Sequence, residues 1–203
     1  MFSRGSLKNK MARNRYKILD TAVRLIGEQG GFHQISVDEI LKQSNVQKSN
    51  FYYHFKSKEA LALATLDAMI QRVDEEIWQG ILQNKALSPK ERLDKLVETL
   101  VQQFEASQGK VGDPFANLVV ELKGHETEFQ QKVNDFFIRY SAYLEGVIQE
   151  GIEEDEFRPS LIPREVAEAI LSQIEGAYIL ARAYEEPAAL RRNIEFLINV
   201  IST

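Results

Sequence analysis

Residues 35–61, ISVDEILKQSNVQKSNFYYHFKSKEAL, decide how the N-terminal part of this chain folds. Ser36 precedes an apolar helical pattern and Glu39 follows three residues later, which is the signature of a capping box. In that motif the serine hydroxyl accepts a hydrogen bond from the Glu39 backbone N–H, and the Glu39 carboxylate accepts one from the Ser36 backbone N–H. The pattern predicts a helix over residues 37–44.

A three-residue turn and a second short helix follow. Asn45 opens the turn and is a residue type that tolerates left-handed backbone angles. The next helix covers residues 48–55, where Phe51 and Phe55 stand four positions apart and share the face that packs inward. A capped helix, a short turn and a second short helix are typical of a helix-turn-helix motif, whose second helix enters the major groove of DNA.

The second helix carries polar side chains at the positions that its buried face leaves free. A core helix would not combine two tyrosines and a histidine with lysine, serine and asparagine. These side chains can donate hydrogen bonds to phosphates and, at the start of the helix, to bases. The alternative interpretation is that Tyr52 and Tyr53 pack between helices. For His54, no residue at a supporting spacing indicates a metal site or catalysis.

The formal charge is unevenly distributed along the 203 residues. Residues 1–60 hold eleven Lys or Arg and five Asp or Glu, a net charge of +6, whereas residues 61–203 hold fourteen and twenty-five, a net charge of −11. A basic module on an acidic body suggests binding to a polyanion, although a solvated basic tail has the same composition. We expect a flexible basic arm over residues 1–10 and a first helix over residues 11–29.

The composition excludes several kinds of site. The chain has no cysteine and three histidines, which rules out disulfides, thiolate zinc sites and cysteine nucleophiles and argues against a histidine-rich metal site. It has no run of about 18 apolar residues, and its basic N-terminus lacks the apolar segment of a secretory signal. We therefore expect a cytoplasmic protein with no cofactor, no metal and no membrane partner.

Beyond residue 57 the pattern predicts helices and no strands. Proline at first helical positions and glycine at helix ends divide this part into six further helices. Their expected ranges are 58–82, 88–107, 113–124, 126–153, 163–185 and 187–203. The expected fold class is all-α with nine helices, arranged as a three-helix DNA-binding domain over residues 11–57 and a second helical domain over residues 58–203.

Residues 13–63 resemble the TetR (tetracycline-repressor) family of bacterial transcriptional regulators, most recognisably from Phe51 to Leu61. The resemblance implies a homodimer whose N-terminal domain binds double-stranded operator DNA and whose C-terminal domain holds a small-molecule pocket and the dimer interface. The family usually has glycine where this chain has Asn45, and often Ser-Lys-Gly-Thr or Ser-Lys-Gly-Ala where it has residues 47–50. The second departure changes which operator is read.

Matching the family's motif position by position gives the DNA contacts that the resemblance implies. Basic residues before the first helix would approach the backbone or minor groove, the cap of the second helix would touch phosphate, and the start of the third would read bases. The implied contacts are Arg13, Arg15, Ser36, Gln47, Lys48, Ser49, Asn50, Tyr52, Tyr53, His54 and Lys58.

Residues 112–118, GDPFANL, resemble more weakly a subgroup of the family with Gly-Cys-Pro-Phe/Leu-Gly-Asn-Leu here, and Asp113 stands at the cysteine position. Most large side chains of the second domain are core, but a subset could line a ligand pocket. The candidate ligand contacts are Trp78, Phe104, Phe115, Asn117, Glu121, Phe137, Tyr140, Gln173 and Tyr178. Asn117 and Glu121 could equally make interhelical hydrogen bonds or face solvent.

The last two predicted helices carry apolar stripes that either pair with a second copy, as in the family, or fill the core of one chain. The candidate interface residues are Ala169, Ile170, Gln173, Ala177, Leu180, Ile194, Leu197, Ile198 and Ile201. Two helix-turn-helix modules at a fixed separation would read a palindrome with half-sites about one helical turn apart.

The sequence therefore predicts a TetR-like regulator and, most simply, a repressor. A small molecule would release it from a palindromic operator by favouring a dimer whose recognition helices are spaced wrongly. An activator or a non-inducible regulator would carry the same DNA module. An enzyme would need an acid–base pair or a nucleophile, and the nearest candidate, the carboxylates of residues 150–156, resembles a solvated helix end. A purely structural helical binder is the remaining alternative.

Overall fold

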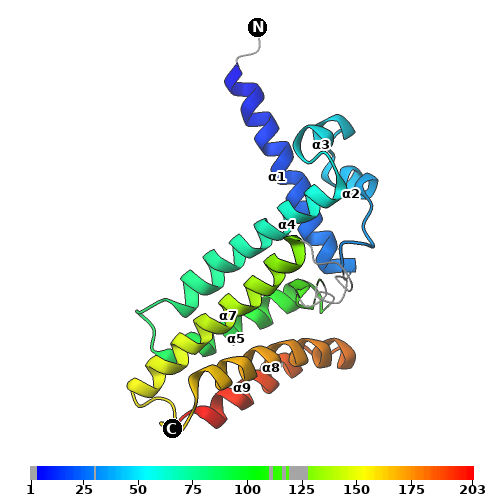
Figure 1. Cartoon of the computed structure of the whole chain (residues 1–203). Helices are drawn as coiled ribbons and strands as arrows, with labels where there is room; N and C mark the ends of the chain where they lie inside the picture. The colour runs from blue at the N-terminus through cyan, green and yellow to red at the C-terminus, as the bar shows by residue number, and fades with distance from the viewer. Residues whose placement is uncertain (1–3, 30, 110–111, 116–117, 119–127) are drawn as a thin grey trace.

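The computed structural model describes residues 4–29, 31–109, 112–115, 118 and 128–203. Within these ranges the chain forms eight α-helices and one π-helix, which confirms the all-α prediction (Figure 1). The elements are α1 (Arg4–Gln29), α2 (Val37–Ser44), α3 (Lys48–His54), α4 (Lys58–Val73), η1 (Asp74–Leu82), α5 (Pro89–Ala106), α7 (Glu128–Glu153), α8 (Pro163–Tyr184) and α9 (Pro187–Ile201). Most of the helix expected over residues 113–124 lies outside the described residues.

The N-terminal module is built as its local signals predict. Ser36 Oγ accepts a hydrogen bond from the Glu39 backbone N–H at 3.1 Å and starts α2. Asn45 ends that helix in the left-handed conformation, with φ 53° and ψ 44°. Ile18, Ala22, Leu25 and Ile26 of α1 are buried, as are Phe51 and Phe55, where α1 packs against α2 and α3.

Two local predictions in this module are wrong. The first helix starts at Arg4 rather than at residue 11, because residues 4–10 contain no proline and several good helix formers. The Glu39 carboxylate does not complete a capping box, since it accepts a hydrogen bond from the Gln29 side-chain amide at 2.8 Å instead. That bond ties the end of α1 to the start of α2.

One long rod, α4 followed by η1, connects the N-terminal module to the rest of the protein (Figure 1). Ser57 starts it by accepting a hydrogen bond from the Ala60 N–H. The uninterrupted α-helix expected over residues 58–82 is wrong, because the chain widens to a π-helix at Asp74. Gly80 accommodates the wider turn, since a Cβ there would lie 3.0 Å from the Glu75 carbonyl oxygen.

The C-terminal body contacts this rod through α5 and α7. Helices α8 and α9 lie side by side, α7 packs on α8, and α5 packs on α9 (Figure 1). A complete capping box starts α5, where Ser88 and Glu91 bond reciprocally to each other's backbone N–H groups. The C-terminus is held to the loop after α7, since the Thr203 N–H donates to the Glu156 carbonyl oxygen at 3.1 Å. In the described part of the chain, no helix is long and apolar enough to cross a membrane.

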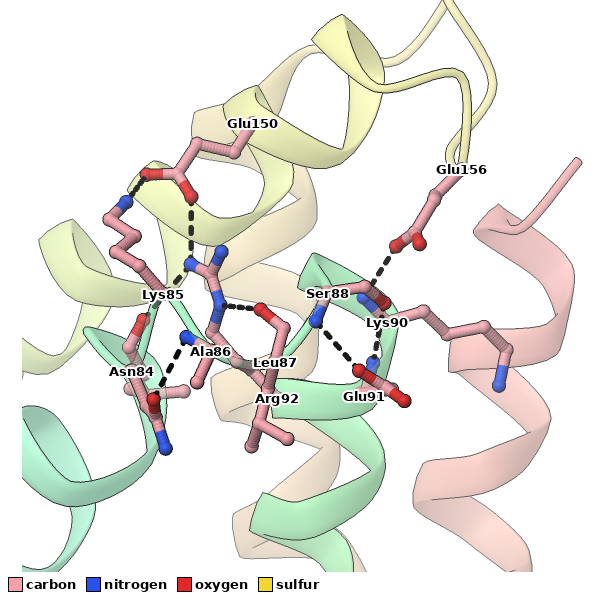
Figure 2. A network of polar contacts seen from close by, with 11 residues as sticks. Asn84, Lys85, Ala86, Leu87, Ser88, Lys90, Glu91, Arg92, Glu150 and Glu156 are labelled. Atoms are coloured by element: carbon pink, nitrogen blue, oxygen red, sulfur yellow. Dashed lines mark hydrogen bonds and ion pairs between the residues drawn. The ribbon is translucent and has the colours of Figure 1, made fainter.

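A buried guanidinium joins the end of η1, the following loop, α5 and α7 (Figure 2). Arg92 is 2% exposed. It donates to the Leu82 and Leu87 carbonyl oxygens at 3.3 and 3.1 Å and to the Glu150 carboxylate at 2.7 Å. Lys85 also pairs with Glu150 from the loop. The position of the rod's far end therefore depends on one side chain of α5.

The carboxylates of residues 150–156 are thus not simply a solvated helix end. Glu150 accepts a hydrogen bond from Arg92 and also pairs with Lys85. Partial burial alone would raise the pKa of Glu150, but these two cations hold it below its usual value. Glu156 accepts a hydrogen bond from the Lys90 backbone N–H at 2.8 Å (Figure 2). Both acids hold the end of α7 to α5.

Replacing Arg92 tests this network. In Arg92→Met, the Leu82 and Leu87 carbonyl oxygens lose a buried donor, so we expect the free energy of unfolding to fall by about 3 kcal/mol. Lys85→Met is the matched control, because its exposed ion pair is worth less than about 1 kcal/mol. Urea unfolding at one protein concentration measures both. Equal stability of the two variants would contradict the assignment.

Candidate DNA-binding site

Helix α3 presents its polar side chains to solvent. Phe51 and Phe55 are buried against α1 and α2, which fixes the rotation of the helix. Tyr52 and Tyr53 are 53% and 64% exposed. The alternative in which this tyrosine pair packs between helices is therefore wrong, and both phenol groups are accessible to DNA.

The start of α3 carries the base-reading positions that the sequence predicts. Gln47, Lys48 and Ser49 are exposed, and Asn50 is half-buried. The Lys48 ammonium pairs with the Asp38 carboxylate of α2 at 3.1 Å. The hydrogen bond that Lys48 donates to Asp38 raises the pKa of Lys48, so the lysine stays charged. The sequence gives no signal for this ion pair, because Asp38 and Lys48 are ten residues apart.

Two basic side chains outside α3 lie over aromatic rings of the N-terminal module. The Arg15 guanidinium of α1 lies over the Phe55 ring, 5.6 Å from its centroid. Lys58 lies 5.2 Å from the centroid of the Phe32 ring and donates to the His33 carbonyl oxygen at 3.4 Å. Cation–π contacts of this kind hold a cationic side chain in place without neutralising it.

Three other predicted contacts differ in how they are placed. Arg13 is exposed on α1, and Ser36 is exposed but its hydroxyl already caps α2. His54 is half-buried, with its ring 4.9 Å from that of Tyr53 and its Nε2 atom shielded from solvent. The Nε2 atom of His54 therefore does not lie on the solvent-exposed surface of α3.

The second domain contains a buried aromatic cluster within its core. Trp78 of η1, Phe104 of α5, Tyr140 of α7 and Tyr178 of α8 are all buried. The Phe104 and Tyr178 rings are 5.9 Å apart, and the Trp78 and Tyr140 rings are 6.2 Å apart. Five of the candidate ligand contacts belong to this cluster, since Phe115 joins it by stacking on the ring of Phe136.

The remaining candidate ligand contacts are placed elsewhere or are not described. Gln173 donates to the Asn193 carbonyl oxygen of α9 at 3.3 Å, so it links two helices. Phe137 is half-buried beside Phe136. Asn117 and Glu121 lie outside the described residues.

The expected interface stripes on α8 and α9 face mainly inward. The structure places Ile170, Ala177, Ile194, Ile198 and Ile201 in the core of the single chain, each at most 3% exposed. The stripes arise because α8 packs on α7 and α9 packs on α5. Gln173, Leu180 and Leu197 are half-buried, and Ala169 is exposed.

A different apolar face is exposed on the same two helices. Ile179 of α8 is 68% exposed, and Phe196 and Val200 lie one turn apart on α9 with Phe196 69% exposed. Gly176 has no side chain to project from this surface of α8, and a Cβ there would meet no atom within 4 Å. The sequence signal was present but weak, because single exposed apolar residues are common on protein surfaces.

The described residues offer nothing that resembles a metal centre. Among them, no group of three or more His, Cys, Asp or Glu side chains could hold a metal ion.

Lys48 tests the DNA-binding assignment. Its pair with Asp38 must be exchanged for a contact with DNA, so we expect Lys48→Ala to weaken binding to a selected genomic fragment by about tenfold. If the contact is to phosphate, the slope of log affinity against log salt should fall by about one. Fluorescence anisotropy over a salt series measures both. Lys95→Ala, an exposed lysine of α5, is the control, and an equal loss there would contradict the assignment.

Comparison with known proteins accounts for both parts of the chain. A family model described as bacterial regulatory proteins, tetR family, matches residues 18–65. A second, described as the tetracyclin repressor-like C-terminal domain, matches residues 89–197. The first covers the helix-turn-helix module and the second covers most of the C-terminal body.

Curated relatives match along most of the chain. The fatty acid metabolism regulator protein of Bacillus subtilis is 29% identical over 175 residues, which is 82% of each chain. An uncharacterized HTH-type transcriptional regulator of Lactococcus lactis is 26% identical over 183 residues, or 89% of each chain. Both are regulators by name.

Solved structures share the fold. A TetR-family regulator from Agrobacterium tumefaciens superposes with a TM-score of 0.86 at 21% identity, covering 95% of this chain and 100% of that one. A regulatory protein TetR from Rhodobacter sphaeroides gives a TM-score of 0.84 at 20% identity, covering 92% and 97%. With an exposed recognition helix and two matching family models, the chain is a DNA-binding transcriptional regulator, not an enzyme, and it belongs to the tetR family.

Proposed function

We propose that this protein is a homodimeric repressor, that it binds a palindromic operator in the cytoplasm, and that a small molecule in its C-terminal domain releases it. The continuity of α4 and η1 carries the proposal, because one rod runs from the DNA-binding module to the aromatic cluster. Trp78 lies on that rod inside the cluster. A ligand that moves Trp78 therefore acts on the element that carries the DNA-binding module.

The release follows from linkage. A ligand that prefers the dimer with wrongly spaced recognition helices weakens operator binding, and the operator weakens ligand binding by the same factor. The rod is held at its outer end by Arg92 and along its side by the Asp74–Arg139 ion pair of 3.3 Å. Trp78 lies on η1 between these two contacts. A displacement of Trp78 by a ligand would therefore pass along η1 to α4.

The exposed face of α8 and α9 supports the dimer. Ile179, Phe196 and Val200 would be covered by the same face of a second copy, which gives a self-complementary contact. Such a contact would set the two recognition helices at one separation, as a palindrome requires.

The experiment is selection of genomic DNA fragments by the purified full-length protein at near-physiological salt, followed by sequencing. We expect a small set of palindromic sites, including sites upstream of genes. Phe196→Glu should shift sedimentation from dimer to monomer and remove this selection, because a buried charge opposes the contact. Glu168→Gln, an exposed position of α8, should change neither.

Three outcomes contradict parts of the proposal. Diffuse, salt-labile binding would rule out an operator, and an unchanged dimer in Phe196→Glu would rule out this face. Genes that lose expression when the regulator is deleted would indicate an activator. Because one relative is named for fatty acid metabolism, an acyl-chain compound belongs among the ligands tested for operator release.

A further inference from the structure

A groove of about 660 Å³ lies between α7 and the end of η1. Its apolar wall is formed by Leu82 of η1 and by Tyr143 and Val147 of α7. Ala142 and Gly146 are exposed on α7 and leave space beside this wall, since a Cβ at Gly146 would meet no atom within 4 Å. A concave, mainly apolar surface of this volume with a few polar groups is typical of a small-molecule site.

Charged side chains lie at the two ends of the groove. Arg139 and Glu150 both line it and are eleven residues apart on α7, which corresponds to about 16 Å along the helix axis. A single small head group therefore meets only one of the two ends. At the Glu150 end the carboxylate already binds Arg92 and Lys85, so this end is occupied by contacts within the protein (Figure 2).

The Arg139 end is open to an anion. The Arg139 side chain is 50% exposed, and its contact with the Asp74 carboxylate is 3.3 Å, which is long for a charge-assisted hydrogen bond. A guanidinium has five N–H donors in a planar fork, and this is the one hydrogen bond that Arg139 makes within the described part of the chain. The same fork can bind a ligand carboxylate through two parallel hydrogen bonds.

Two side chains connect the groove to Trp78. The Arg139 guanidinium lies 4.6 Å from the centroid of the Trp78 ring, and the Tyr143 ring, one turn further along α7, stacks on Trp78 at 5.1 Å. The partner of Arg139, Asp74, is the first residue of η1. A ligand that takes the Arg139 guanidinium therefore weakens a contact at the junction of α4 and η1 as well as a contact with Trp78.

We propose that the effector is an aromatic carboxylate that binds in this groove, with its carboxylate on Arg139 in place of Asp74 and its ring on Tyr143. This inference rests on the proposed ligand-released repression. An aromatic body fits the site because ring stacking adds to the burial of apolar surface. An ammonium head group would be repelled by Arg139, and a hydroxyl would form a weaker hydrogen bond than a carboxylate does. Asp74 is partly exposed, so water can replace its lost partner.

The test compares four probes whose polar group ends the same three-carbon chain: phenylpropionate, phenylpropanol, phenylpropylammonium and cyclohexylpropionate. Titration calorimetry with the full-length protein measures their affinities. We expect phenylpropionate to bind about tenfold more tightly than phenylpropanol, because a hydrogen bond to a charged group is the stronger one. Phenylpropylammonium should bind most weakly, and cyclohexylpropionate less tightly than phenylpropionate because it cannot stack.

Trp78 gives an independent signal because it is the only tryptophan in the chain. None of the four probes absorbs at the red edge of the indole absorption band, so Trp78 fluorescence can be excited selectively. Phenylpropionate should change this fluorescence with the midpoint that calorimetry gives, since Arg139 and Tyr143 both contact the ring.

Two variants separate this site from general hydrophobic binding. In Arg139→Gln the preference for phenylpropionate over phenylpropanol should disappear, while phenylpropanol still binds and shows that the variant is folded. Gly146→Leu should fill the groove and prevent binding of all four probes. Leucine favours a helix more than glycine does, so its urea midpoint should not fall. Arg164→Gln is the matched control, since Arg164 is an exposed arginine of α8 with its own carboxylate partner, Glu168.

Operator release is measured by fluorescence anisotropy with a selected operator fragment. Saturating phenylpropionate should weaken operator binding by about fivefold or more, which is the usual lower range of coupling between two sites. Phenylpropylammonium at the same concentration should have no effect.

The outcomes separate the groove from the proposed function. Equal binding of phenylpropionate and phenylpropanol, an unchanged preference in Arg139→Gln, or unchanged binding in Gly146→Leu overturns the site. If phenylpropionate does not bind but another compound releases the operator, ligand-released repression stands and the groove fails. If phenylpropionate binds with the expected preferences but operator affinity does not change, release through this groove is overturned.

Discussion

The buried guanidinium of Arg92 fixes the geometry on which the two domains depend. It binds the last carbonyl of η1, the loop after it and a carboxylate of α7, so three segments meet at one side chain (Figure 2). A rod can transmit a displacement only if its far end is held. Leu82 is held by α5, and in the proposed mechanism a change at Trp78 would therefore be passed along η1 toward α4.

The N-terminal module could be read from the sequence because its signals are local. The Ser36 cap, the left-handed Asn45 and the inward pair Phe51 and Phe55 act within a few residues, and each is confirmed. The tyrosines of α3 could be assigned to the outer face by elimination, since the inner face was already filled. Where the partner was distant, the prediction failed: Glu39 bonds to Gln29 of α1 rather than to its own helix cap.

The C-terminal domain was less predictable for the same physical reason. An apolar stripe indicates that one face of a helix is buried, but it does not indicate which element buries that face. Five of the stripe residues of α8 and α9 lie in the core of their own chain. The π-helix is a response to packing and to Gly80, not to a period in the sequence. Glu175 could have been noticed as an acid three residues before Tyr178 in a buried stripe. Its pKa is raised to about 9 by burial and by Asp113, which is more than sixty residues away.

The two halves of the chain have opposite charge for separate reasons. The basic residues gather on α1 and around α3, where cation–π contacts and one ion pair hold them in place for a polyanion. Part of the acidic excess is structural, as Glu150 and Glu156 show, and part is the pair of Glu175 and Asp113. Charge thus separates the basic module that carries the recognition helix from the acidic C-terminal domain.

The measurement that tests the central claim most directly is the distance between the two DNA-binding modules. The chain has no cysteine, so a single cysteine at Lys42, an exposed position of α2, can carry a spin label in each protomer. Pulsed electron–electron double resonance should give one narrow distance between the two labels when a selected operator is bound. In the free protein it should give a broader distance distribution with a shifted mean. Absence of any coupling between labels, or a distribution that stays broad when the operator is bound, would contradict a dimer that reads two half-sites at a fixed spacing.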